Sequence, residues 1–229
     1  KDHMEKVVIS LGGSILIPDD RDGTFLKDLA SLLRTLTDDL EIYVVCGGGK
    51  VARYYINTGR DLDATEEQLD ELGIGVTRLN ARLLQLALKD MAYDEVPVTV
   101  EETAAQGRCG RVAVMGGTTP GHTTDGVSAA LAEKVGASRI VNATSVDGVY
   151  SADPRKFPEA RRYDRLTFDQ LGEMMAGGHG AGNSHVFDPM GAEIVKRCRI
   201  PLFIVSGRDL QDMEDAIRGR KVKGTVIGG

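Results

Sequence analysis

Glycine-rich segments follow three of the β-branched runs in this chain. Leu11-Gly12-Gly13-Ser14 ends the first run, Gly47-Gly48-Gly49-Lys50 follows the second, and Gly116-Gly117 opens a segment that reaches Asp125. Glycine lets the backbone approach a ligand closely because no Cβ intrudes. The N–H groups of such loops can converge on anionic oxygens, helped by the N-terminus of a following helix. Three such segments together predict a ligand with several phosphates, or two phosphorylated ligands.

The two best-known nucleotide fingerprints are missing from these segments. The sequence after Gly47 does not read GxxxxGK[ST], so it is not a P-loop, and the first segment does not read GxGxxG, which disfavours dinucleotide binding. For any one glycine pair taken alone, the geometry of a tight turn is a sufficient explanation. The functional interpretation therefore depends on the three segments occurring together.

The pattern of the chain predicts the elements that must position these loops. Runs rich in β-branched residues predict strands at 6–11, 41–46, 97–100, 111–115, 139–143, 202–205 and 225–227. Helical spacing of apolar residues predicts helices at 24–36, from 50 onward, and at 66–89, 125–135, 167–175, 189–197 and 209–217. Strands that alternate with helices imply a mainly parallel sheet covered on both faces, and such sheets bind ligands at the carboxyl ends of their strands.

Composition narrows the class of protein. The chain has 229 residues, of which 41% are apolar and 27% charged, and its net charge is −6. We expect one α/β domain over 4–229, with residues 1–3 an expression remnant ahead of Met4. The acidic balance argues against nucleic-acid binding, and no apolar run is long enough for a membrane span. The three cysteines are far apart and odd in number, which disfavours a zinc site or disulfides and fits a reducing cytoplasm.

At these residues the chain resembles the amino acid kinase superfamily and, within it, the uridylate kinases, most closely the archaeal type. The resemblance runs from Val7 to Ile227 and rests on motifs in a fixed order: the glycine pairs above, GGGxxxR at 47–53, Asp70-Glu71-Leu72-Gly73, TTD at 123–125, VDGVYSADP at 146–154, and Asp188. It implies a three-layer α/β/α sandwich around a mainly parallel sheet. It also implies transfer of a phosphoryl group from ATP to UMP with Mg²⁺, in a cytoplasmic homohexamer.

The resemblance further implies which residues hold the donor. The expected ATP-binding residues are Gly13, Ser14, Gly49, Arg53, Thr144, Tyr150 and Asp153. Backbone groups of the glycines and Ser14 would contact the phosphates, Tyr150 would lie beside the adenosine, and Asp153 would accept a hydrogen bond from it. An ordinary loop with turns at Asp147-Gly148 and Asp153-Pro154 is the alternative for the last motif.

The acceptor is expected in the N-terminal half. The implied UMP-binding residues are Gly48, Asp70, Thr118, Thr119, Pro120, Gly121, His122, Thr123 and Thr124. Asp70 would accept hydrogen bonds from the ribose hydroxyls, although it also fits a charged helix face. The threonines would contact the base or the phosphate, and Thr124 or Asp125 could equally cap the next helix.

Two residues are implied in catalysis, Arg53 and Asp188. A guanidinium can hold phosphate oxygens with paired hydrogen bonds, whereas Asp188 followed by Pro189 is also explained as a helix start. The acceptor phosphate is largely ionised near pH 7, because its second pKa is about 6. No strong general base is therefore required. No protein ligand of Mg²⁺ is identified, and His179 and His185 lie in a glycine-rich stretch expected to be a loop over the nucleotide.

One departure leaves a rival open. Many kinases of this superfamily carry a lysine two residues before the first glycine pair, where this chain has Ser10. The missing charge would have to come from Arg53, Lys50, magnesium or backbone amides. A non-catalytic nucleotide-binding protein on the same fold is the rival hypothesis. A kinase of an amino-acid or carbamate acceptor is disfavoured by Asp70 and the 118–124 loop, since those acceptors have no ribose.

Overall fold

The computed structural model of the chain describes residues 4–18, 23–108, 110–176 and 186–229. Cys109, His179 and His185 lie outside these residues, so the predictions made for them stay untested. The strands are β1 (Glu5–Leu11), β2 (Leu40–Cys46), β3 (Val112–Met115), β4 (Arg139–Thr144), β5 (Arg165–Leu166), β6 (Leu202–Ser206) and β7 (Thr225–Ile227). The helices are α1 (Gly13–Leu16), α2 (Thr24–Leu36), α3 (Gly49–Asp61), α4 (Glu66–Leu88), α5 (Val100–Gln106), α6 (Thr124–Val135), α7 (Phe168–Ala176), α8 (Pro189–Cys198) and α9 (Leu210–Ile217), with a 3₁₀ turn at Lys89–Met91.

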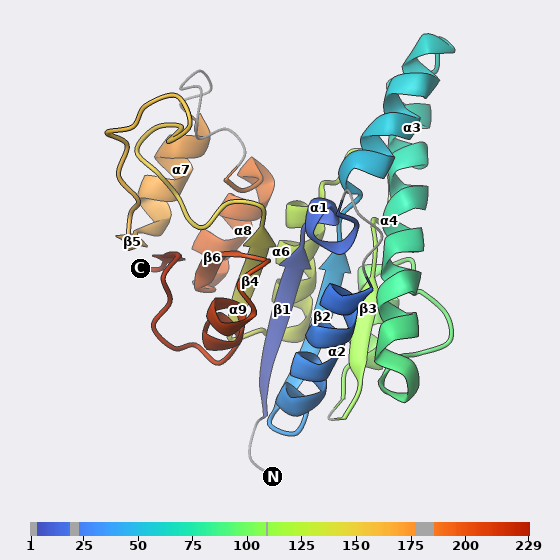
Figure 1. Cartoon of the computed structure of the whole chain (residues 1–229), viewed down its shortest axis with the longest axis horizontal. Helices are drawn as coiled ribbons and strands as arrows, with labels where there is room; N and C mark the ends of the chain where they lie inside the picture. The colour runs from blue at the N-terminus through green and yellow to red at the C-terminus, as the bar shows by residue number, and fades with distance from the viewer. Residues whose placement is uncertain (1–3, 19–22, 109, 177–185) are drawn as a thin grey trace.

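The strands form one sheet in the order β3-β2-β1-β4-β6-β7-β5. Every pairing is parallel except β6 with β7. Figure 1 shows helices in front of and behind this sheet, with α2 and α9 on the near side and α6 and α8 behind. The prediction of an α/β sandwich with a central, mainly parallel sheet is confirmed.

The core lies in two layers, one on each face of the sheet. Along β1, Val7, Ile9 and Leu11 belong to a cluster that also contains apolar residues of α2, α4 and α9. The intervening Val8 belongs to the opposite cluster, with residues of α6, α7 and α8. This alternation follows from the twofold side-chain period of a strand, and it buries both faces, as a parallel sheet requires.

One predicted element is wrong. The run 97–100 was expected to be a strand, but helix α5 begins at Val100, and the Thr99 side chain accepts a hydrogen bond from the N–H of Glu102. Thr99-x-x-Glu102 is a helix-start pattern, and it prevails here over the β-propensity of the flanking valines. The structure also contains the short elements α1 and β5, which the sequence did not predict.

Candidate active site

The first two glycine loops pack backbone against backbone. A Cβ placed on Gly13 would lie 2.1 Å from the nitrogen of Gly49, so only glycine fits there. Gly49 has φ +64°, a left-handed conformation that also favours glycine. Gly47 donates to the carbonyl of Leu11, at 2.9 Å, and so ties the two loops to neighbouring strand ends. Gly13, Gly48 and Gly49 are therefore brought together beyond the carboxyl ends of β1 and β2.

Both loops lead directly into helices whose first turns lack a side-chain cap. Helix α1 begins at Gly13, and α3 begins at Gly49 after Gly48. The first N–H groups of α3 keep their capacity to donate, which suits a phosphate oxygen. Arg53 is exposed and lies about one turn further along α3. Its guanidinium is positioned on the same helix that presents these amides.

The third glycine segment is held by α4, and this was missed from the sequence. Arg78 donates from Nε to the carbonyl of Gly117, at 3.2 Å, and from Nη2 to that of Thr118, at 2.9 Å. Thr77 accepts the N–H of Gly117 at 2.7 Å. A Cβ on Gly116 would lie 2.7 Å from the backbone nitrogen of Arg78. The start of this segment, which we call the acceptor loop (116–123) because UMP is expected there, is thus fixed against the middle of α4.

Helix α4 also reaches the other end of that loop and the second glycine loop. The carboxylate of Asp70 accepts the N–H of Gly121 at 2.8 Å. Asn80, which is buried, donates to the carbonyls of Gly47 and Gly48 at 2.9 and 3.3 Å. Thr77, Asn80 and Gln85 are buried polar residues on a helix side whose other buried residues are apolar. That interruption is the signal by which the sequence could have indicated a role for them.

The end of the acceptor loop joins Asp188. Thr123 caps α6 by accepting the N–H of Gly126 at 3.0 Å, so the predicted cap at Thr124 or Asp125 is wrong. The hydroxyl of Thr123 donates to Oδ2 of Asp188. Oδ1 of Asp188 accepts the N–H of Met190, which makes Asp188 the N-cap of α8 with Pro189 in the first turn. Asp188 therefore starts α8, as expected, and contacts the end of the third glycine segment; its role toward the transferred phosphate stays a prediction.

Ser10, which stands where a lysine would be usual, forms a hydrogen bond with a carboxylate of α6. Its buried hydroxyl donates to Oδ1 of Asp125, 3.1 Å away and 115 residues later in the chain. Burial raises the pKa of the Asp125 carboxyl to about 6; the hydrogen bond from Ser10 opposes this shift, and the charge of Asp188 adds to it. Among the described residues, Asp125 and Asp188 thus lie near the glycine loops without an ion pair to a cationic side chain.

The other residues expected to bind ATP, Thr144, Tyr150 and Asp153, lie at the end of β4 or in the loop that follows it. Gly12 donates to the carbonyl of Ala143 at 3.0 Å, which places the end of β4 beside the first glycine loop. The hydroxyl of Thr144 accepts the N–H of Val146 at 3.0 Å. This contact turns the chain from β4 into the 146–153 loop, which carries Tyr150 and Asp153.

Tyr150 and Asp153 are occupied by partners within their own loop. The hydroxyl of Tyr150 donates to Asp147 at 2.9 Å, and this hydrogen bond to a carboxylate raises the pKa of Tyr150. Asp153 accepts from the side chain and the backbone N–H of Arg155, and these contacts lower its pKa. The roles proposed for both residues toward ATP stay predictions.

The remaining residues expected to bind UMP are at least partly accessible to solvent. Thr119, Gly121 and His122 are exposed, and Thr118, Pro120 and Thr124 are partly buried. Within the residues that the structure describes, no group of three or more His, Cys, Asp or Glu side chains is arranged to hold a metal ion. None of the helices in the described ranges combines the length and apolarity needed to cross a membrane.

Comparisons with known proteins agree with this arrangement. The model of the amino acid kinase family matches residues 5–206. A curated uridylate kinase from Methanoculleus marisnigri is 45% identical over 225 residues, which cover 98% of this chain and 96% of that protein. One from Thermococcus onnurineus is 43% identical, over 97% of this chain and 99% of that protein. The crystal structure of a uridylate kinase from Archaeoglobus fulgidus superposes with a TM-score of 0.86 at 42% identity, covering 97% of this chain and all of that one.

Proposed function

The chain belongs to the amino acid kinase family, and on that premise we propose that it is a uridylate kinase, which transfers the γ-phosphoryl group of ATP to UMP and gives UDP and ADP. Relatives named uridylate kinase match it over nearly its full length at 41–45% identity. The observation that carries the proposal is the meeting of the glycine loops. Two of them interlock at Gly13 and Gly49, and the third is anchored on the helix that also carries Asp70.

The geometry suits phosphoryl transfer without a base. In the proposed reaction an oxygen of the UMP phosphate attacks the γ-phosphorus, and the bond from that phosphorus to the β–γ bridging oxygen breaks as ADP leaves. Such chemistry depends on positioning and on neutralising charge. The amides of Gly13, Ser14 and Gly49 and the guanidinium of Arg53 would supply the neutralisation. Asp188 would orient the acceptor through Thr123, which it contacts.

The two substrates are proposed to occupy different halves of the domain. UMP would lie in the N-terminal half, against Gly48, Asp70 and the 118–124 loop. ATP would extend over the C-terminal half, toward Thr144, Tyr150 and Asp153. The carbonyl of Ala143 accepts a hydrogen bond from the N–H of Gly12, so the two halves meet at the first glycine loop. The phosphates of the two substrates would face each other there.

Mg²⁺ is proposed to enter with ATP. It favours oxygen ligands and usually keeps several waters, with one or two carboxylates and substrate phosphates completing its shell. Asp125 and Asp188 are the carboxylates near the loops; burial, and to a lesser degree the charge of Asp188, raises the pKa of Asp125. Bound there, the ion would neutralise phosphate charge. The uncharged side chain of Ser10 cannot do this.

We also propose that the chain assembles as a homohexamer in the cytoplasm and serves pyrimidine nucleotide synthesis. Exposed large apolar residues on α3, at its C-cap and on α4 support self-association. They are Tyr54, Tyr55, Leu62, Leu72, Leu79, Leu83 and Leu86. Large exposed apolar patches commonly mark protein contacts. Light scattering after size-exclusion chromatography measures the assembly, and a monomer at micromolar concentration would contradict this part of the proposal.

The decisive test is an ATP-dependent assay with UMP, CMP, AMP and isopentenyl phosphate as acceptors. We expect UMP to be the preferred acceptor by kcat/KM. Turnover of another acceptor, with none of UMP, would overturn the proposal.

Ser10 favours a second candidate, a nucleotide-binding protein without turnover, because its buried hydroxyl contacts Asp125 and carries no charge. Thermal stabilisation by both ATP and UMP, with no product formed, would support that candidate instead.

A further inference from the structure

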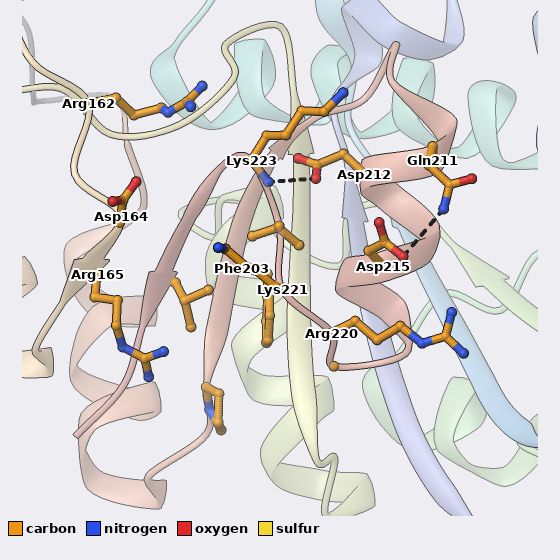
Figure 2. Close-up of a pocket in the computed structure, with 14 residues that line it drawn as sticks. Arg162, Asp164, Arg165, Phe203, Gln211, Asp212, Asp215, Arg220, Lys221 and Lys223 are labelled. Atoms are coloured by element: carbon orange, nitrogen blue, oxygen red, sulfur yellow. Dashed lines mark hydrogen bonds between the residues drawn. The ribbon is translucent and has the colours of Figure 1, made fainter.

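A large cavity lies outside all the residues assigned above. It has a volume of about 950 Å³ and is bounded by α9, by the 218–224 segment that follows α9, by the outer face of β6 and β7, and by residues 162–165. Figure 2 shows Arg162, Asp164 and Arg165 on one side of it and the α9 residues Gln211, Asp212 and Asp215 on the other. Ligand pockets in proteins are typically about 300–1,000 Å³, so the cavity is large enough for a nucleotide.

The floor of the cavity is apolar for an identifiable reason. Helix α9 packs on β4 and β6, and in the described part of the chain no helix covers β7 on that face (Figure 1). Phe203 of β6 and Val226 of β7 therefore form the base of the cavity together with Val222. All three border the core cluster on this side of the sheet. A flat apolar group laid on them would extend that core.

The rim is positive on a protein whose net charge is −6. Five basic side chains line the cavity: Arg162, Arg165, Arg220, Lys221 and Lys223. Arg162 and Lys223 are paired with Asp147 and Asp209, at 3.1 Å each. The side chains of Arg165, Arg220 and Lys221 have no ion-pair partner among the described residues. These three keep their full capacity to bind an anion.

The acidic residues of the lining are partly neutralised by contacts with the chain itself. Asp212 is buried and accepts the backbone N–H groups of Lys223 and Gly224, at 2.7 and 3.3 Å. Asp215 accepts from the Gln211 amide at 3.3 Å. Asp212 thereby fixes the path of the segment that carries Lys221. Asp164 is the lining carboxylate whose side chain has no hydrogen-bond or ion-pair partner among the described residues.

We propose that this cavity is a binding site for a phosphorylated anion of nucleotide size that carries a flat apolar group, separate from the sites of ATP and UMP. The flat group lies on Phe203 and Val226, and the phosphates contact Arg165 and Lys221. Figure 2 places Lys221 beside Phe203, between the two walls, where one ligand can reach both.

The cavity shares a wall with the donor loop. The backbone of Arg162 bridges to Tyr150, and a Cβ on Gly148 would lie 2.7 Å from the Arg162 side chain. Thr225, next to Val226, accepts the N–H of Val149 at 2.9 Å. An occupant that shifts these walls changes the loop that carries Tyr150 and Asp153. The cavity and the loop that carries Tyr150 and Asp153 therefore share structural supports, whereas binding in the cavity does not depend on the proposed function.

Calorimetric titration of the full chain with UTP, ATP and inorganic tripolyphosphate tests the site. The titration is made with the substrate sites free and again with them filled by a bisubstrate compound that joins adenosine and uridine through a polyphosphate. With those sites filled, we expect one nucleotide to bind each chain with a Kd below roughly 1 mM. Tripolyphosphate should bind more weakly, because it lacks the flat group. Complete loss of nucleotide binding when the bisubstrate is present, or equal binding of tripolyphosphate, would overturn the proposal.

Variants locate the site. Arg165→Glu with Lys221→Glu should weaken this binding about tenfold or more, since each lost charged contact is worth on the order of 1 kcal/mol or more. The control is Lys27→Glu with Arg60→Glu, an equal change in net charge at exposed positions of α2 and α3. Should the double variant fold poorly, as judged by its melting temperature, Lys221→Gln alone serves the same comparison. Equal weakening in the control would show a general charge effect and contradict the site.

The outcome can be separated from that of the proposed function. If the bisubstrate does not bind, the kinase proposal is in question, yet the comparison of the cavity variant with its control still decides the cavity. If the chain turns UMP over normally and neither variant changes nucleotide binding, the kinase stands and the cavity proposal fails.

Discussion

The acceptor loop and the donor loop are held in place in different ways. The loop at 116–123 is fixed by side chains of α4 that lie 39 to 51 residues earlier in the chain. The loop at 144–155 is shaped mainly by contacts within itself, such as Tyr150 with Asp147 and Arg155 with Asp153. Its distant supports come from Arg162 and from Thr225.

This difference teaches where each substrate's affinity is encoded. Under the proposed function, side chains of one helix hold the acceptor side, so changes on α4 should alter UMP binding and leave ATP binding nearly unchanged. Changes near Thr225 should do the reverse. Arg53, on α3, is proposed to contact the phosphates where the two halves meet.

The largest effect is expected at that junction. Arg53→Ala should lower kcat by on the order of a hundredfold or more, as when one charge-stabilising donor is removed from a reaction centre. Steady-state kinetics with both substrates varied measures it. Arg60→Ala, on the same helix and also exposed, is the control. A near-normal kcat would remove Arg53 from the mechanism.

Asp70→Asn should act on the acceptor side alone. Hydrogen bonds to a charged group are worth about 1.5–3 kcal/mol, so the KM for UMP should rise by roughly tenfold to a hundredfold. The KM for ATP should change little. An equal effect on both substrates would place Asp70 outside the acceptor site. Glu71→Gln, at the next and equally exposed position, controls for the loss of charge.

Arg78→Ala tests the anchoring of the acceptor loop by a residue that need not touch substrate. Two hydrogen bonds to carbonyls are lost, and at about 1 kcal/mol each the KM for UMP should rise by up to roughly thirtyfold. Arg82→Ala, one turn later and bonded to Gln85, is the matched control. If the KM for ATP rises as much as that for UMP, the division between the halves does not hold.

Thr225→Val is the matching change on the donor side. The buried hydroxyl accepts from Val149 and donates to Tyr163, at 2.9 and 2.6 Å. Valine fills the same space but leaves both groups unpaired, which costs about 1–3 kcal/mol of stability. We expect a several-fold rise in the KM for ATP, with the KM for UMP unchanged. A loss of stability without any kinetic change would make Thr225 purely structural.

The smallest effect concerns Asp125, at the boundary of the two halves. Its folded-state pKa is raised from 3.8 to about 6, so the protonated form is favoured in the fold and stability is lost as pH rises through that range. Asp125→Asn should remove this loss. Because the carboxyl is only partly buried, we expect a gain of about 1 kcal/mol at pH 8, or roughly 2–4 °C in Tm. Melting curves at pH 4 and pH 8 measure it; the same shift at both would contradict the assignment.

Much of the fold could be read from the sequence because its signals are local. Buried β-branched runs predicted all the longer strands, and Asp188 followed by Pro189 predicted a helix start that the structure contains. The strand expected at 97–100 is absent because the helix-start pattern at Thr99 outweighs the β-propensity of the flanking valines. A two-residue strand such as β5 has too little sequence of its own to be recognised.

In the candidate site, too, local features could be predicted from the sequence and long-range contacts could not. The three glycine loops, their order and the resemblance that they carry were determined by the sequence, because only glycine tolerates the approach that Gly13 and Gly49 make. The sequence could not show that Arg78 grips the loop at Gly117, that Ser10 contacts Asp125, or that Lys221 borders an apolar cavity. Those contacts join residues tens to more than a hundred positions apart, and no local preference encodes them. They exist only because the packed sheet and its helices bring distant segments together.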